Sequence, residues 1–290
     1  MNTNFPESMF LPVNEESVKF GKDISSKRKI FFCGIARNVE KTIKKNIERI
    51  VRTAEAFSEY KIFIYENDSN DNTPLILSSD SRVISTCDRR ESSNYWNDIN
   101  NGTVNHHYFR CVELAKCRNK YLDHARNYYG HYDYLCVIDL DIHGWSYDGF
   151  YDSVAIMEAH DNCSSVSSYG VLSDFNNHAT LEDSKRYLMY DSFSFRPLGY
   201  NQMLTSVDQA RFNSIQPVID NPIQVRCNFG GLAIYKMKHA TQSKYQAKFS
   251  KGLVDVEHVH FYDMMSKNNG IHIFNQKMIS SYSKHKFVEG

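Results

Sequence analysis

Short apolar runs alternate with amphipathic stretches through the first half of the chain. Residues 29–36 and 60–65 are mainly apolar over their whole length, as expected for strands that are buried on both faces. Between these runs, apolar residues recur every three or four positions from 39 to 57, which is the spacing of a helix with one buried face. The order of strand, helix and strand predicts two parallel strands joined by a right-handed crossover.

The alternation continues up to residue 145. The pattern predicts a strand at 82–86, a polar loop at 88–107, a helix at 109–128 and a strand within 134–145. Polar residues cluster where the predicted strands end. We therefore expect an α/β fold that is Rossmann-like, with a mixed but mostly parallel central sheet flanked by helices. Such a sheet predicts a nucleotide site at the carboxyl ends of its strands.

The second half of the chain has a different pattern. A predicted helix at 147–160 and a predicted strand at 163–169 precede a region, 173–226, that is rich in aromatic, Asn and Asp residues and has no sustained periodicity. We interpret this region as acceptor-binding loops. Regular structure is predicted again at 228–235, as a helix at 255–265, and as strands at 271–274 and 278–282.

The length of 290 residues fits one large domain, because a single core reaches its upper size near this length. No internal repeat or interdomain linker interrupts the chain. We predict an N-terminal extension at 1–28 and one domain at 29–290. Within that domain, 29–145 would bind the nucleotide and 146–290 would bind the acceptor.

The formal net charge is zero, from 34 basic and 34 acidic residues, which argues against a general nucleic-acid binder. The seven cysteines include no CxxC pair, and four of them lie in apolar or helical patterns, so we interpret them as free thiols in a reducing compartment. No signal-type leader and no apolar window of about 18 residues is found. We expect a cytoplasmic protein with at most peripheral membrane contact.

Two carboxylates at the end of the strand predicted within 134–145 are the most informative residues. Asp139 and Asp141 follow an apolar run and are separated by one residue, and positions i and i+2 of a strand face the same side. At the carboxyl end of a buried strand, such a pair can hold Mg²⁺ or Mn²⁺ against a diphosphate. The plain alternative is a solvated pair of charges at a strand end.

Further motifs occur in a recognisable order along the chain. They are Glu66-Asn67-Asp68 after the second strand, Gly230-Gly231, Glu257 at a helix start, and His285 after the last strand. Together with Asp139 and Asp141, they resemble the glycosyltransferases of the GT-A fold. A narrower similarity, to fungal capsule-associated α-1,3-mannosyltransferases and their bacterial and viral relatives, rests on 190–196, 229–235 and 257–259.

This resemblance implies a metal-dependent enzyme that moves a hexose from a nucleoside-diphosphate sugar to a glycan, a lipid-linked glycan or another hydroxyl acceptor, in surface polysaccharide or glycoconjugate synthesis. Mn²⁺ or Mg²⁺ would be held by Asp139, Asp141 and His285, and Glu257 would be the catalytic base. The nucleotide would contact Ala36, Arg37, Asn38, Glu66, Asp68, Arg118 and Asp139. The sugar or acceptor would contact Trp145, Tyr190, Asp191, Arg196, Gly230 and Gly231.

Each assigned residue also has a plain structural explanation. The arginines could form ordinary ion pairs, including one between Asp191 and Arg196. Glu257 could be a charge favoured by the helix dipole, and His285 an exposed tail residue. The glycine pair could form a tight turn.

Two other functions remain open. A nucleotidyltransferase would use a similar site but usually has an early glycine-rich phosphate loop, for which Gly34 to Arg37 is too sparse. A non-catalytic sugar-binding protein of the same fold would be expected to lose one metal carboxylate, and both are present.

Overall fold

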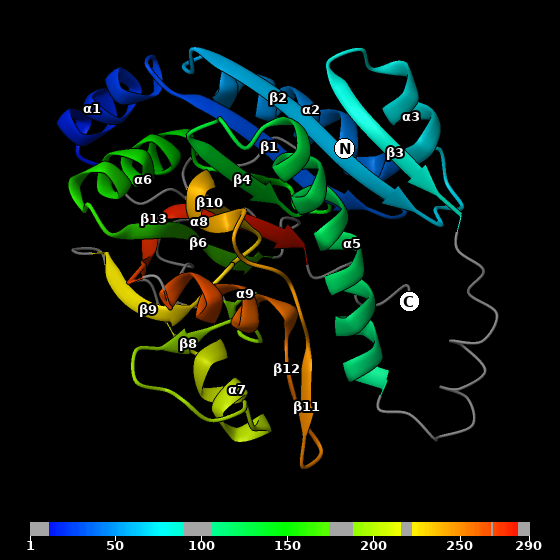
Figure 1. Ribbon diagram of the computed structural model, residues 1–290, viewed down its shortest axis with the longest axis vertical. Coiled ribbons are helices and arrows are strands. Elements are labelled where there is room, and N and C mark those ends of the chain that lie inside the picture. Colours follow the sequence, from blue (N-terminus) through cyan, green and yellow to red (C-terminus); the bar gives the residue numbers. More distant parts are fainter. Residues whose placement is uncertain (1–11, 90–105, 174–187, 216–221, 268, 284–290) are drawn as a thin grey trace.

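The structure is a computed structural model that describes residues 12–89, 106–173, 188–215, 222–267 and 269–283 (Figure 1). The main sheet contains β1 (Lys29–Ala36), β2 (Glu59–Asn67), β3 (Val83–Asp88), β4 (Tyr134–Ile138), β5 (Gly144–Trp145), β6 (Cys163–Ser173), β7 (Leu188–Met189), β8 (Arg196–Pro197), β9 (Ile223–Cys227), β10 (Leu232–Lys236) and β13 (Ile271–Ser283). A separate hairpin is formed by β11 (Lys248–Ser250) and β12 (Leu253–Asp255). The helices are α1 (Glu15–Ser25), α2 (Glu40–Ala54), α3 (Thr73–Ser79), α5 (His106–Tyr128), α6 (Tyr147–Ala159), α7 (Ser206–Asn213), α8 (Met237–Ala240) and α9 (Glu257–Ser266).

The main sheet has the strand order β3-β2-β1-β4-β10-β6-β13-β9-β8. Strands β3, β2, β1 and β4 run parallel to one another, and β13 runs parallel to β6. Strand β10 lies between β4 and β6 and is antiparallel to both. The predicted α/β fold, with a mostly parallel central sheet flanked by helices, is therefore confirmed.

Both faces of the sheet are covered, as the apolar strands require. Ile30 and Phe32 of β1 point into one core cluster, which also contains side chains of α2 and α6. Phe31 and Cys33 point into the opposite cluster, with side chains of α5 and α9. Because successive side chains of a strand face opposite sides, an apolar run of this kind needs a helical layer on each face.

Two predicted strands differ from the structure near the site. The strand predicted within 134–145 was expected to end in Asp139 and Asp141, but β4 ends at Ile138 and both residues follow it. The predicted strands at 271–274 and 278–282 are parts of the single strand β13, which continues through a register shift between Asn275 and Ile279. The polar residues at this shift predicted an interruption between two strands, whereas a bulge keeps both halves in the sheet.

Other parts of the chain contain more regular structure than the sequence predicted. The described part of 173–226 includes the short strands β7, β8 and β9 and the helix α7, so it is not made of loops alone. The hairpin β11–β12 and the helix α1 were not predicted. Helix α1 lies beside α6, where the hydroxyl of Ser17 donates a hydrogen bond of 2.5 Å to Asp152 (Figure 1).

The predicted loop at 88–107 lies mostly outside the described residues. Among the helices that the structure does describe, none has the length and apolar character needed to cross a membrane.

Candidate active site

A cavity of about 630 Å³ lies where β1, β2 and β4 reach their carboxyl ends. Its walls come from the segments after these strands, from one face of α5, and from Tyr190. Parallel α/β sheets bind their ligands at this edge, because the strand ends and the following loops leave a crevice there. The predicted site residues that line this cavity are Ala36, Arg37, Asp68, Arg118, Asp139, Asp141 and Tyr190.

Asp139 and Asp141 both line the cavity, but not by the alternation of a strand. They lie in the turn after β4, and the backbone N–H of Asp139 donates a hydrogen bond of 2.9 Å to the carbonyl of Gly231. Burial raises the pKa of Asp139 above its ordinary value, Arg118 opposes this, and the charge of Asp141 adds to it. The pair therefore concentrates negative charge at one end of the cavity.

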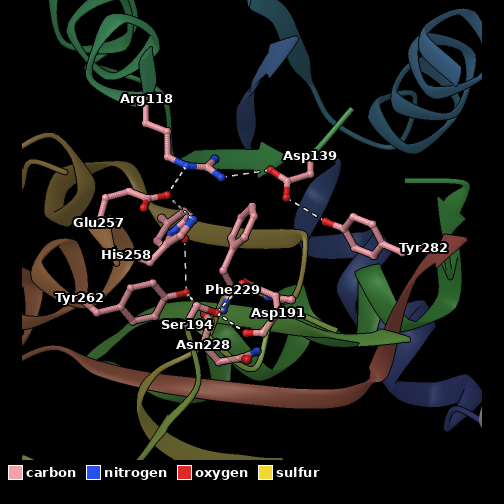
Figure 2. Close-up of polar contacts among 12 residues, drawn as sticks. Arg118, Asp139, Asp191, Ser194, Asn228, Phe229, Glu257, His258, Tyr262 and Tyr282 are labelled. Carbon is pink, nitrogen blue, oxygen red and sulfur yellow. Dashed lines mark hydrogen bonds and ion pairs between the residues drawn. The ribbon is translucent and has the colours of Figure 1, made fainter. Parts of the chain in front are cut away.

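The carboxylate of Asp139 is held on both sides by protein donors (Figure 2). Arg118 donates from Nη2 to Oδ1 at 3.2 Å, and the hydroxyl of Tyr282 donates to Oδ2 at 2.8 Å. Arg118 also donates from Nε to Oε1 of Glu257 at 3.0 Å. These four side chains form a row from α9 through α5 and the β4 turn to β13 (Figure 2), of which Arg118 and Asp139 line the cavity.

Aromatic rings enclose the guanidinium of Arg118. Its central carbon lies 5.0 Å from the ring centre of Phe229 and 6.0 Å from that of Tyr245. His258 stacks on Phe229 at 4.2 Å, and burial together with the charge of Arg118 lowers the pKa of His258 well below its ordinary value. The imidazole is therefore neutral at neutral pH and adds no charge beside Glu257.

One nitrogen of Arg118 is left over. Nη1 is buried and has no hydrogen-bond partner among the described residues, whereas Nε and Nη2 are both used. A buried donor without a partner costs free energy, which a ligand oxygen can recover. Because Arg118 lines the cavity, this nitrogen is suited to an anionic ligand.

The structure does not bring Glu257 to the cavity, which corrects its predicted role as a base facing the acceptor. Its side chain is only 3% exposed and lies behind Arg118, and it is not among the lining residues. The first side chain of α9 meets the guanidinium of Arg118 and not the cavity.

Trp145 and Arg196, predicted to contact sugar or acceptor, also lie away from the cavity. Trp145 is fully buried, and its indole N–H donates to the hydroxyl of Thr53 at 3.2 Å. Arg196 is fully buried and pairs with Asp255 at 2.8 Å, not with Asp191 as the plain alternative predicted. Both residues hold the core together, and we no longer assign them to the ligand.

Gly230 and Gly231 serve close packing inside the protein. Both have positive φ, of +63° and +86°. A Cβ at 230 would lie 2.1 Å from the carbonyl oxygen of Ser168, and a Cβ at 231 would lie 2.3 Å from the hydroxyl oxygen of Tyr282. The second glycine thus leaves the room that Tyr282 needs to reach Asp139, and neither glycine lines the cavity.

Asp191 lies next to the lining residue Tyr190 in a strained turn. Its φ is +63°, and its Oδ2 accepts hydrogen bonds from the hydroxyl of Ser194 at 2.6 Å and from the N–H of Gly230 at 3.3 Å. Burial raises the pKa of Asp191 to about 7, and the charge of Asp139 contributes to the rise. The residue ties this turn to the glycine pair.

Asn38 and Glu66, predicted to contact the nucleotide, are not among the residues that line the cavity, and both make hydrogen bonds between or within loops. The N–H of Asn38 donates to the hydroxyl of Ser69 at 2.9 Å, and its Oδ1 accepts from the N–H of Asn70 at 2.8 Å. Glu66 is buried and accepts from the N–H of Ser69 at 2.8 Å. These contacts fix the loop after β1 against the loop after β2.

Several lining residues were missed in the sequence. Arg110, Glu113, Leu114 and Cys117 share one face of α5, which their spacing of three and four residues could have shown. The contact of Tyr282 with Asp139 could not be predicted from local spacing, because the two positions are 143 residues apart.

A divalent cation fits this site only with help from a ligand or from residues elsewhere. Among the described residues, no group of three or more His, Cys, Asp or Glu side chains gathers that could hold a metal. Two lining carboxylates suit Mg²⁺ or Mn²⁺, which commonly take one or two carboxylates together with substrate phosphates. The third predicted ligand, His285, lies outside the described residues.

No family model and no curated protein matches this sequence. Among solved structures, GalNAc-T7 with UDP, GalNAc and Mn²⁺ has a TM-score of 0.50 and 10% identity, covering 98% of this chain and 55% of that chain. The mannosyltransferase PcManGT from Pyrobaculum calidifontis, in complex with GDP-Man and Mn²⁺, has a TM-score of 0.48 and 12% identity, covering 88% of this chain and 56% of that chain. TarS from S. aureus, in complex with UDP-GlcNAc, has a TM-score of 0.47 and 11% identity, covering 88% and 58%.

This chain therefore spans little more than half the length of these structures. At such low identity, the likeness establishes the fold alone, which is that of the GT-A glycosyltransferases.

Proposed function

We propose that this protein is a metal-dependent glycosyltransferase that uses a nucleoside-diphosphate sugar as donor and a hydroxyl group as acceptor. The observation that carries the proposal is the position of Asp139 and Asp141, which both line the cavity at the carboxyl ends of parallel strands. The shared GT-A fold supports it, because the similar structures include complexes with nucleotide sugars and with Mn²⁺.

Different residues that line the cavity would bind different parts of the donor. Asp141 and Asp139 would hold Mn²⁺ or Mg²⁺, which neutralises the negative charge that develops on the departing diphosphate. Arg118 would donate from its free Nη1 to a phosphate oxygen, and Arg37 would add positive charge at the rim. Asp68, after β2, would accept from ribose hydroxyls.

The sugar would lie at the acidic end, against the ring of Tyr190. This ring is stacked on Tyr282, with ring centres 3.3 Å apart, so it is held in place from behind. An aromatic face beside two carboxylates offers an apolar surface and hydrogen-bond acceptors, which suits a hexose. The division into a donor half at 29–145 and an acceptor half at 146–290 accords with most lining residues preceding 146.

The narrower motifs at 190–196 and 229–235 support a hexose donor and a glycan or lipid-linked glycan acceptor in the synthesis of a surface polysaccharide or glycoconjugate. These are the motifs in which the chain resembles the capsule-associated α-1,3-mannosyltransferases. We propose a cytoplasmic location with at most peripheral membrane contact, in keeping with the seven cysteines, none of which forms a disulfide bond.

A thermal-shift screen tests donor binding directly. A bound ligand stabilises the folded state by RT ln(1 + [L]/Kd), which is about 2.7 kcal/mol at a hundredfold excess over Kd. We expect one or more UDP- or GDP-linked sugars to raise the unfolding temperature in the presence of Mn²⁺ and to have little effect without it.

The same screen separates the other two functions. Stabilisation only by a nucleoside triphosphate together with a sugar phosphate would instead indicate a nucleotidyltransferase. Stabilisation only by free sugars would indicate a binding protein. No stabilisation by any nucleotide sugar would contradict the proposed function.

A further inference from the structure

The guanidinium of Arg118 places a positive charge next to a candidate metal ligand. Nη2 of Arg118 lies 3.2 Å from Oδ1 of Asp139, and the side chain of Arg118 is only 5% exposed. Opposite charges at about 4 to 6 Å or less strongly favour each other, so this arginine competes with any cation that approaches Asp139. A metal site built on Asp139 therefore needs something that weakens this competition.

Glu257 is in position to do so from the far side of Arg118. Its Oε1 lies 3.0 Å from Nε, and its side chain is 3% exposed, so water screens the pair very little. The neighbouring His258 is neutral because burial lowers its pKa, and it supplies no charge of its own. The positive charge of Arg118 is thus shared between Asp139, which lines the cavity, and Glu257, which does not.

We propose that Glu257 is a positioning residue, which neutralises Arg118 so that Asp139 can bind a divalent cation in the cavity. Glu257 does this without touching the cation or the substrate. The inference rests on the proposed function, since that function requires the cation.

The orientation of Asp139 does not depend on Arg118 alone. The hydroxyl of Tyr282 donates to Oδ2 of Asp139 at 2.8 Å, and the backbone N–H of Asp139 donates to the carbonyl of Gly231 at 2.9 Å. Removal of the arginine would therefore change the charge around Asp139 while two other contacts keep its carboxylate in place. This allows the charge of Arg118 to be tested apart from geometry.

The central variant is Glu257→Gln, which keeps an acceptor for Nε but removes the negative charge. Arg118 is then balanced by Asp139 alone, and we expect the affinity for Mn²⁺ to fall by about tenfold, the size of effect that a neighbouring charge exerts on an ionisable group. The measurement is a titration with Mn²⁺ alone, followed by the electron paramagnetic resonance signal of free Mn²⁺. Because no nucleotide is present, the proposed contact of Arg118 with a phosphate does not affect this measurement.

Asp255→Asn is the matched control. It breaks another buried pair, between Arg196 and Asp255 at 2.8 Å, in which the arginine is fully buried and neither residue lines the cavity. Loss of one partner of a buried pair destabilises a protein in either place. We expect both variants to unfold at lower temperature, and only Glu257→Gln to lose Mn²⁺ affinity.

Addition of Arg118→Met to Glu257→Gln should raise the Mn²⁺ affinity again. It removes both charges of the pair, so no uncompensated buried charge remains between them. The affinity for Mn²⁺ should return to within roughly threefold of the wild-type value. Because this variant leaves no unpaired buried arginine, it also carries the test if Glu257→Gln does not fold.

The outcomes separate this inference from the function on which it rests. Wild-type affinity in Glu257→Gln, or a double variant that binds Mn²⁺ more than roughly threefold more weakly than the wild type, overturns the role of Glu257 and leaves the proposed function standing. Where the wild type binds Mn²⁺ only with a nucleoside diphosphate present, the comparison of Glu257→Gln with Asp255→Asn is made in its presence. A wild-type protein that binds no Mn²⁺ in either condition overturns both.

Discussion

At the scale of single residues, the carboxylate of Asp139 connects distant parts of the chain. It accepts one hydrogen bond from Arg118 on α5 and another from Tyr282 on β13. Tyr282 reaches it only because position 231 has no side chain, since a Cβ there would lie 2.3 Å from the tyrosine hydroxyl. A glycine that does not line the cavity therefore controls a candidate metal ligand that does.

Gly231→Ala should disturb the site through Tyr282. The added methyl group displaces the hydroxyl from Asp139, and a misplacement of about 1 Å can cost about a hundredfold in rate. We expect Mn²⁺-dependent transfer to fall by roughly that factor.

Gly252→Ala is the matched control for this change. Its φ of +79° is similar to that of Gly231, but a Cβ there meets nothing within 4 Å. Both variants carry backbone strain, of about 1–3 kcal/mol. Equal transfer rates in the two variants would show that the contact of Tyr282 does not matter.

At the scale of elements, the sequence predicted what depends on local pattern. The strand expected at 29–36 has the same bounds as β1, because its apolar residues are buried by helices on both faces. The strand ends that carry Arg37, Asp68 and Asp139 were also predicted, and the structure gathers them in one cavity.

Contacts that join distant segments were not predictable in the same way. The partner of Arg196 is Asp255, 59 residues away, and the partner of Glu257 is Arg118, 139 residues away. Strand β10 also lies antiparallel between β4 and β6, and no local periodicity of the sequence predicts this. The placement of Glu257 behind Arg118 follows from these long-range packings, so the sequence pattern alone assigned it to the open side.

His285, predicted to be the third metal ligand, lies outside the described residues and follows β13 in the sequence. Within β13, the hydroxyl of Tyr282 donates to Asp139. We expect His285→Ala to weaken binding of Mn²⁺ and of a nucleoside diphosphate together, as measured by calorimetry.

Lys286→Ala is a control for that experiment, since it changes the same tail without removing an imidazole. Unchanged affinity in His285→Ala would return this residue to the exposed-tail interpretation.

At the scale of the whole molecule, the partly buried carboxyl of Asp191 links stability to pH. Burial raises its pKa to about 7 from an ordinary value of 3.8, so the folded protein holds a proton that the unfolded chain releases between these values. The stabilisation is complete below the lower value and is lost as the pH rises to the higher one.

Asp191→Asn removes this titration. The stability of the wild type relative to the variant should decrease from about pH 5 to about pH 7 and stay constant above that. Chemical denaturation of both proteins at each pH measures the difference, in which the titration of buried histidines such as His258 cancels. A difference that does not change with pH would contradict the raised pKa of Asp191.

The fold by itself does not decide the chemistry, because one fold can serve unrelated functions. The claim that this molecule transfers a sugar depends on the two carboxylates that line the cavity, Asp139 and Asp141. Turnover is therefore the most direct test.

The decisive measurement is the release of nucleoside diphosphate from the donor that the binding screen selects, with and without Mn²⁺. We expect release by the wild type only with the metal, a loss of about two to three orders of magnitude in Asp141→Asn, and an unchanged rate in Asp161→Asn, an exposed carboxylate outside the cavity. Release that proceeds without metal, or that continues at the wild-type rate in Asp141→Asn, would contradict the account.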